Sequence, residues 1–233
     1  MVAQQLIDKV KSEGRNALTE IEAKELLSQA GIDVTETRLA SSKEEAVSLS
    51  EQLGYPVVLK IVSPDVIHKS DAGGVKLGLE TAVQVGDAYD EILKSIGKQY
   101  PDADIQGISV QKMARSGVEV IVGMSTDSQF GPVIMFGLGG IMVEILKDVS
   151  FRIVPLEPRD AREMIREIKG FPVLEGYRGQ EAVDIANLES LILKVSAFID
   201  QYPEVEELDL NPIFAYSDGA VAVDARVMLG ESD

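Results

Sequence analysis

The chain has 233 residues with 39 Asp or Glu against 22 Lys or Arg, which gives a formal net charge of −17. A field of that sign repels nucleic acids, and a chain with no cysteine and a single histidine excludes disulfides, thiolate metal sites and multi-histidine zinc sites. No apolar run approaches the ~20 residues of a membrane span, and no secretory signal begins the chain, so we expect a cytoplasmic protein without nucleic-acid or membrane partners.

In chain order, the first 105 residues alternate helical and extended patterns. A helix is predicted through Lys11, and another within 18–32, where Thr19 and Glu22 have the spacing of a capping box and Gly31 ends the helix. The β-branched run YPVVLKIVS has strand length, and its one charged member is Lys60. A strand at VKLGLE and a long helix ending at a proline complete this region.

From residue 105 the pattern changes to consecutive strands, IQGISVQKMA, GVEVIVGMST and GPVIMFGLGG, which indicate an antiparallel sheet. Two helical segments and a C-terminal hairpin with the turn SDG follow. We therefore predict an α+β fold with two α/β lobes and a cleft between them. The expected lobes are residues 1–105 and 106–233, and residues 1–15 could pack on the other lobe.

A glycine pair marks the first candidate site, in the stretch SDAGGVK. Gly73 and Gly74 would let backbone N–H groups approach phosphate oxygens, and Lys60 and Lys76 would supply positive charge from the flanking strands. The stretch is not a P-loop, because no GxxxxGK[ST] occurs and a strand follows it. The alternative is a flexible hairpin tip.

Acidic and amide side chains mark the second candidate site, in the C-terminal hairpin. Asp209 and Asn211 are two residues apart and so share a face of their strand, as do Asp224 and Arg226 across the hairpin. Two carboxylates and an amide oxygen suit a hard cation that keeps waters and takes ligands from phosphates. The alternative is a hairpin with solvated polar residues.

Four stretches occur in one order along the chain: VVLK…AGGVK, VEVIVG, FGLGGIMVEILKDVSFRIVPL and LDLNPI…VDARV. In this order they resemble the ATP-grasp subunit of ADP-forming acetyl-CoA synthetases, which belong with succinyl-CoA synthetase to one acyl-CoA synthetase superfamily. The resemblance covers nearly the whole chain and implies an ATP-grasp fold with the nucleotide in the cleft. It implies an acid–thiol ligase that converts acetyl-CoA, ADP and phosphate to acetate, ATP and CoA.

The resemblance also implies a partner and a set of substrates. A separate α subunit would carry the CoA-binding domains and a phosphorylated histidine, in an α2β2 heterotetramer. This chain, as the β subunit, would bind ATP or ADP with Mg²⁺ and transfer phosphate between the phosphohistidine and ADP.

By position in the motifs, the resemblance assigns residues to the nucleotide, to the metal and to catalysis. It implies that the two lysines and the glycine loop contact the nucleotide phosphates. A hinge at 111–113 would face adenine, and a glutamate would bind the ribose hydroxyls. Many relatives have glutamate where this chain has Asp209. The implied residues are, for the nucleotide, Lys60, Gly73, Gly74, Lys76, Gln111, Lys112, Met113 and Glu119; for the metal, Asn211, Asp224 and Asp209; and for catalysis, His68, Glu144 and Arg226.

His68, the only histidine, lies beside the glycine pair. The resembled synthetases have a histidine there, which implies a second phosphate carrier, since a neutral imidazole nitrogen is nucleophilic near pH 7. The alternative is that His68 shapes the loop through a hydrogen bond to Asp71. Glu144 is implied as a contact of the incoming phosphohistidine, and its alternative is a surface carboxylate.

Two other functions stay open from the sequence. A stand-alone ATP-grasp ligase would need an acyl-acceptor domain, for which this chain has no length left. The ATP-grasp part of a protein acetyltransferase or another regulatory subunit often lacks the metal ligands or the loop lysines, which are all present here.

Overall fold

The computed structural model describes residues 3–66, 69–140, 147–177, 179 and 181–230. The chain divides into two compact units. Unit 1 comprises Met1–Val34 and Arg115–Asp233, and unit 2 comprises Thr35–Ala114. This division differs from the expected one at residue 105, because the strand expected to open the second lobe pairs inside unit 2.

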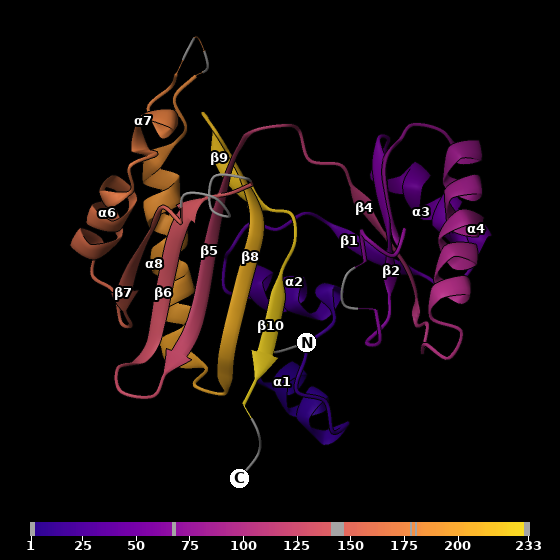
Figure 1. The fold of residues 1–233 in the computed structure, drawn as a ribbon, viewed down its shortest axis with the longest axis horizontal. Helices are drawn as coiled ribbons and strands as arrows, with labels where there is room; N and C mark the ends of the chain where they lie inside the picture. The colour runs from indigo at the N-terminus through magenta and orange to yellow at the C-terminus, as the bar shows by residue number, and fades with distance from the viewer. Residues whose placement is uncertain (1–2, 67–68, 141–146, 178, 180, 231–233) are drawn as a thin grey trace. The chain divides into compact units, whose positions relative to one another are not determined.

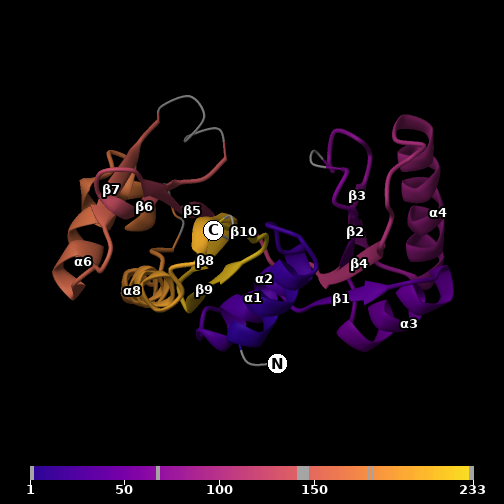
Figure 2. The same cartoon turned by 90° about the horizontal axis from the view of Figure 1, so that it is seen from below.

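Unit 2 is a four-stranded antiparallel sheet with two helices, in the strand order β1-β4-β2-β3 over the part of the unit that the structure describes. Helices α3 and α4 contact each other and lie on the same side of β2 and β4 (Figures 1 and 2). Its elements are β1 (Thr37–Ala40), α3 (Lys43–Leu53), β2 (Val57–Val62), β3 (Val75–Leu79), α4 (Ala82–Gln99) and β4 (Gly107–Lys112).

Alternation along β2 decides which side chains of unit 2 face its helices. Val57, Leu59 and Ile61 belong to one hydrophobic cluster with apolar residues of α4. Because successive side chains of a strand point to opposite faces, Lys60 lies on the face opposite α4.

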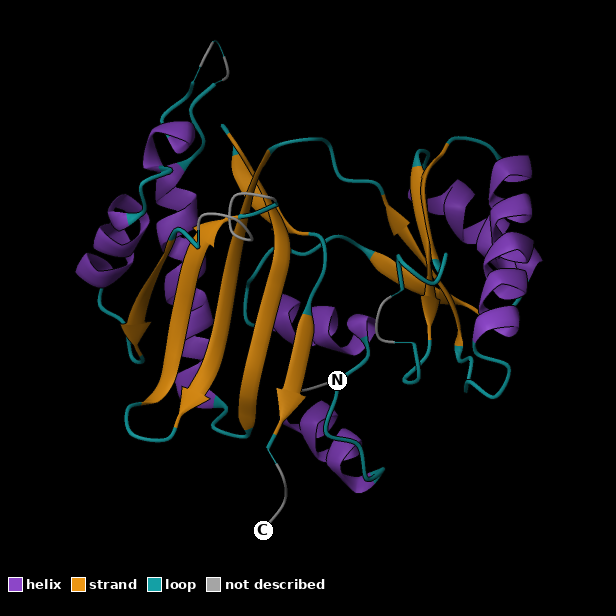
Figure 3. Cartoon of the chain, viewed as in Figure 1, coloured by secondary structure: helices purple, strands orange, loops and turns teal. Residues whose placement is uncertain are grey.

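Unit 1 contains a six-stranded antiparallel sheet, counted over its described residues, in the order β10-β8-β5-β6-β7 with β9 also paired to β8 (Figure 3). The start of the chain joins it, since the Leu18 N–H donates to the Val227 carbonyl at 3.1 Å. The elements are α1 (Ala3–Ser12), α2 (Glu20–Gln29), β5 (Val118–Asp127), β6 (Gly131–Leu138), β7 (Val149–Ile153), α6 (Pro158–Glu167), α7 (Phe171–Leu174), α8 (Ile185–Gln201), β8 (Val205–Tyr216), β9 (Gly219–Ala222) and β10 (Arg226–Leu229).

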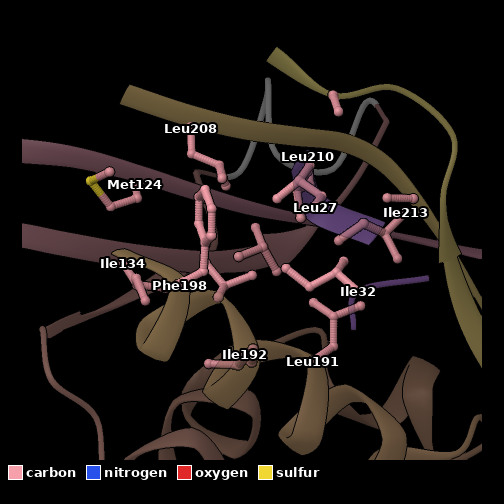
Figure 4. Packing of buried hydrophobic residues seen from close by; sticks show 14 of the residues in the cluster. Leu27, Ile32, Met124, Ile134, Leu191, Ile192, Phe198, Leu208, Leu210 and Ile213 are labelled. Atoms are coloured by element: carbon pink, nitrogen blue, oxygen red, sulfur yellow. The ribbon is translucent and has the colours of Figure 1, made fainter. Parts of the chain in front are cut away.

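The core of unit 1 lies between this sheet and α8 (Figure 4). Phe198 and Ile192 of α8 pack in one cluster with Met124, Ile134 and Leu208 of the strands. The side chains that alternate with these strand residues lie on the opposite side of the sheet, which we call the distal face of unit 1.

Helix starts follow the sequence signals closely. The predicted capping box is present at α2, where the Thr19 hydroxyl accepts from the Glu22 N–H and the Glu22 carboxylate accepts from the Thr19 N–H. At α3, Ser42 caps in the same way, but the Glu45 carboxylate accepts from Ser41 one residue earlier. Among the helices described, none is long and apolar enough to cross a membrane.

Candidate functional site

The acid–amide hairpin lies on the distal face of unit 1. Asp209 and Asn211 alternate with two buried leucines of β8, and Arg226 stands directly opposite Asp209 in the register of β10 with β8. Asp224 lies between β9 and β10, where its carboxylate accepts the next backbone N–H at 2.9 Å. Asp224 therefore does not share a strand with Arg226, as the sequence predicted, because the segment is two strands, β9 ending at Ala222 and β10 beginning at Arg226.

Like charge makes this hairpin suited to a cation. Burial raises the pKa of Asp209 above its ordinary value, the nearby Asp224 charge raises it further, and Arg226 lowers it. Over the described part of the chain, no three or more His, Cys, Asp or Glu side chains form a metal cluster. Two carboxylates with the Asn211 amide oxygen nevertheless fit Mg²⁺, which usually keeps waters and takes ligands from phosphates.

Lys60 and Gln111 share the face of unit 2 opposite α4. Lys60 pairs with Ser109, and Gln111 is two residues further along β4, so their side chains point the same way. Both are buried, at 6% and 1% exposure. The Thr37 hydroxyl donates to Gln111 Oε1 at 3.4 Å.

Lys76 and Lys112, two of the predicted nucleotide contacts, instead contact the helices of unit 2. Lys76 pairs with Leu59, a core residue on the α4 side, and its Nζ lies 2.5 Å from a Glu91 oxygen of α4. Lys112 Nζ donates to the Leu53 carbonyl at the end of α3 at 3.1 Å. The structure therefore does not bring Lys60 and Lys76 together on one face of the sheet. The register pairs Lys76 with Leu59, whose side chain faces α4, whereas the Lys60 side chain faces the other way.

The glycine pair has packing reasons to be glycine. Gly73 has a φ of +71°, and a Cβ at Gly74 would lie 2.6 Å from Ile61 Cγ2. The Gly73 N–H donates to Ser70 at 3.0 Å and the Gly74 N–H donates to Lys69 at 2.7 Å. Both amides expected to hold phosphate therefore already have acceptors inside the loop.

The expected hinge is similarly engaged. The Met113 N–H donates to the Pro56 carbonyl at 3.0 Å, and the Lys112 N–H donates to Glu36 at 3.4 Å. The Met113 side chain is 38% exposed. A base that accepted a hydrogen bond from either N–H would replace one of these contacts.

Glu119 lies in the wall of a large pocket of unit 1. Its carbonyl accepts from Gly139 at 2.7 Å, and its carboxylate borders Gly140. The pocket has a volume of ≈ 880 Å³, within the usual range for small-molecule sites. Arg115, which stacks over the Tyr216 ring at 4.1 Å, lines the same pocket. No feature of the sequence predicted this stacked pair.

His68 and Glu144, the two residues implied to handle phosphohistidine chemistry, lie outside the described residues.

A smaller pocket adjoins the acid–amide hairpin and was not predicted. It has a volume of ≈ 230 Å³ and is lined by Asp209 and Arg226 together with Gly123, Met135 and Phe151. The only signal in the sequence is a glycine inside the strand pattern VEVIVGMS, which marks a close approach but not the approaching group.

Comparison with known proteins adds a family to this geometry. A family model described as an ATP-grasp domain matches residues 9–229. The chain is 52% identical over 227 residues to the acetate–CoA ligase [ADP-forming] I subunit beta of Pyrococcus furiosus, covering 97% of each chain.

Two solved structures of an acetyl-coenzyme A synthetase from Ca. Korarchaeum cryptofilum are also similar. One, in complex with coenzyme A, Ca-AMPCP and HgCl+, has a TM-score of 0.96 and 48% identity, over 98% of this chain and 100% of that chain. The other contains coenzyme A and Mg-AMPPCP, with a phosphohistidine segment pointing towards the nucleotide binding site. Its TM-score is 0.88 and its identity 46%, over 98% of this chain and 100% of that chain.

Proposed function

The chain belongs to the ATP-grasp family and, within it, to the β subunits of ADP-forming acetate–CoA ligases, and on that premise we propose that it carries the nucleotide step of the ligase reaction. The net reaction is acetyl-CoA + ADP + phosphate ⇌ acetate + ATP + CoA. The observation that carries the proposal is the 52% identity over 97% of both chains.

Within that reaction, this chain transfers a phosphoryl group between ADP and a phosphohistidine of a CoA-binding α subunit. Two findings support such a partner: the similar Pyrococcus protein is named a subunit beta, and the similar synthetase contains a phosphohistidine segment. The proposed assembly is α2β2.

Different residues of this chain contact the phosphates, the ribose and the base of the nucleotide. Lys60 contacts the phosphates, Glu119 accepts hydrogen bonds from the ribose hydroxyls, and the 111–113 backbone faces the base. Support comes from the buried position of Lys60 and from the pocket wall at Glu119.

Mg²⁺ would be held by Asn211 and Asp224, with Asp209 beside them. When bound, the ion neutralises phosphate charge. The mutual repulsion of Asp209 and Asp224 supports this assignment, because a cation between two carboxylates relieves it.

Reconstitution tests the proposed function. The partner is copurified with this chain from the native source and identified by mass, and the two are then mixed with acetyl-CoA, ADP and phosphate. We expect ATP and acetate only when both proteins are present. ATP-dependent synthesis of acetyl-CoA by the single chain would establish the stand-alone ligase instead, and no labelling of the partner by [γ-³²P]ATP would favour the regulatory subunit.

A further inference from the structure

The stretch between β4 and β5 connects the two units. It comprises residues 113–117, which form neither helix nor strand, and the boundary of the units falls between Ala114 and Arg115. In the proposed function, the 111–113 backbone faces the base and Glu119 binds the ribose. The groups that recognise one nucleoside therefore lie at the two ends of this connection, so the path of the connection decides whether both can contact the nucleoside at once.

Tyr216, the last residue of β8, holds the unit 1 end of the connection. Its hydroxyl donates to the Arg115 carbonyl at 2.8 Å, and the Arg115 guanidinium lies over its ring, 4.1 Å from the centroid. The same guanidinium forms an ion pair with Asp218, in the turn after β8. We call these contacts among Arg115, Tyr216 and Asp218 the Tyr216 clamp. It engages both the backbone and the side chain of Arg115.

Tyr216 is itself fixed within unit 1. Its carbonyl accepts from the Asp184 N–H at 2.7 Å, at the start of α8. It also pairs with Gly219 in the hairpin of β8 and β9. A side chain on such rigid elements holds its partner more precisely than one on a loop. Tyr216 therefore gives the connection a fixed point of attachment.

Gly117 lets the connection pass close to the clamp. Its backbone does not have a positive φ, so the conformation does not explain the glycine. A Cβ at this position would lie 2.7 Å from the Ala215 carbonyl oxygen and 2.7 Å from Tyr216 Cε1. The next residue, Val118, pairs with Ala215 where β5 begins. The chain is thus held against the end of β8 from Arg115 to the first residue of β5.

The unit 2 end of the connection is held as well. The Met113 N–H donates to the Pro56 carbonyl at 3.0 Å. Only Ala114 separates Met113 from Arg115 in the sequence. Because one residue extends a chain by at most about 3.6 Å, little slack is left between the two attachments.

We infer that Tyr216 is a positioning residue for nucleoside recognition: by holding Arg115 it keeps Glu119 within reach of the ribose hydroxyls while the base contacts the 111–113 backbone. Groups that are in place before binding lose less conformational freedom when the ligand binds. Without the hydroxyl bond, residues 114–117 could leave the end of β8, and the nucleotide would have to order them. Tyr216 acts through Glu119 and does not itself contact the nucleotide, so the inference rests on the proposed function.

Three substitutions separate the backbone bond from the other contacts of the clamp. Tyr216→Phe removes the hydroxyl and keeps the ring. Asp218→Asn weakens only the ion pair, which is exposed and so contributes little. Tyr202→Phe is the matched control, because it removes a tyrosine hydroxyl elsewhere in unit 1 that accepts from the Gln201 side chain.

Two ligands report on the ribose separately from the rest of the nucleotide. Calorimetry on the full chain gives the Kd of Mg-ADP and of the Mg²⁺ complex of 2′,3′-dideoxy-ADP, which lacks the hydroxyls that Glu119 would bind. Tyr216→Phe should raise the Kd of Mg-ADP by about 3- to 10-fold. It should raise the Kd of the dideoxy ligand by less than about twofold, and both control variants should stay within about twofold of wild type for both ligands.

A merely structural role of Tyr216 gives a different pattern. It would weaken both ligands by the same factor, and that result overturns the inference, as does an unchanged Kd of Mg-ADP. A double-mutant cycle with Glu119→Gln gives a second test. In the Glu119→Gln background, Tyr216→Phe should change the Kd of Mg-ADP by less than about twofold, because the group that it positions is already altered. Additive losses would contradict positioning of Glu119.

The wild-type protein distinguishes failure of the inference from failure of the proposed function. A wild-type chain that neither binds Mg-ADP nor labels the partner from [γ-³²P]ATP contradicts the proposed function. Normal labelling with equal affinity for ADP and dideoxy-ADP removes Glu119 from the ribose, and the role of Tyr216 with it. Normal labelling and a wild-type preference for ADP that Tyr216→Phe leaves intact overturns the inference alone.

Discussion

The sheets of the two units differ in whether strand register places the predicted polar residues on one face. In unit 1, register gathers Asp209, Arg226 and Gly123 into one row on one face. In unit 2, register separates the two lysines that were predicted to act together. Lys60 lies opposite the α4 side, while Lys76 lies on it and pairs with Glu91.

This difference shows what spacing along a chain can establish. Residues two apart in a regular strand share a face by alternation alone, which is the basis of the prediction for Asp209 and Asn211. Residues on different strands share a face only if the register allows it. The register of β2 with β3 shifts between Val57 and Leu59, and the one signal for that shift in the sequence is Gly78 inside the strand VKLGL, which has a φ of +68°.

The largest expected effect lies at the acid–amide hairpin of unit 1. Asp224→Ala removes a proposed metal ligand from a link between strands, so the fold should survive. We expect the affinity for Mg-ADP, measured by calorimetry, to fall by on the order of 100-fold. Asp200→Ala, a change at an exposed position of α8, should leave the affinity unchanged. Unaltered affinity in Asp224→Ala would remove this residue from the site.

A second experiment tests the contrast between the two lysines directly. Lys60→Met should weaken Mg-ADP binding by on the order of 10- to 100-fold, because a charged hydrogen bond to phosphate is lost. Lys76→Met should weaken it by less than about threefold, because its ammonium is engaged with Glu91 in a partly exposed pair. Calorimetry on both variants compares residues of the same type and similar volume change. Equal losses would show that Lys76 leaves Glu91 when nucleotide binds.

Much of the fold was accessible from sequence because local signals decided it. The Thr19–Glu22 capping box, the hairpin at SDG and the α+β class are all present. The unit boundary was wrong at β4, because IQGISVQKMA has the same alternation as the strands after it, and its pairing with β1 and β2 depends on distant residues. The roles of the nucleotide residues came from the family resemblance and stay predictions.

The candidate site was harder to predict from the sequence than the fold was. The role of a glycine or a backbone amide depends on which groups pack against it, and the sequence does not show them. Gly73 and Gly74 were assigned to phosphate, yet their N–H groups donate within the loop, and the Gly74 position is crowded by Ile61. Gly123 was not singled out, although it opens the pocket. Glycine type alone does not distinguish a crowded position from one that leaves room for a ligand.

A third experiment compares these two glycines by stability. Gly74→Ala should lower the free energy of unfolding by about 1–3 kcal/mol, since the new Cβ lies 2.6 Å from Ile61 Cγ2 and 3.0 Å from the Lys69 carbonyl oxygen. Gly123→Ala should cost less than about 1 kcal/mol, because its neighbour is the flexible end of Met135. Urea denaturation measures both. A larger cost at Gly123 would mean that its hollow is needed for packing of the free protein.

The smallest expected effect compares the helix starts of the two units. At α2 the Glu22 carboxylate accepts from Thr19 and also from Arg15 at 2.9 Å, whereas at α3 the Glu45 carboxylate accepts from the Ser41 N–H. Burial raises the pKa of Glu22, but the hydrogen bonds from Arg15 and Thr19 lower it by more, so the pKa of Glu22 lies below its ordinary value of 4.5.

Glu22→Gln should therefore destabilise the protein at pH 7 by about 1 kcal/mol, and Glu45→Gln by less than about 0.5 kcal/mol. A lowered carboxylate pKa stabilises the folded state above the ordinary value, and that contribution disappears as the pH falls through the folded-state pKa. The gap between wild type and Glu22→Gln should thus be largest near neutral pH and should narrow below pH 4.5. Urea denaturation from pH 7 to pH 3 measures this trend. A gap that stays constant with pH would show that Glu22 acts through the shape of its cap and not through its charge.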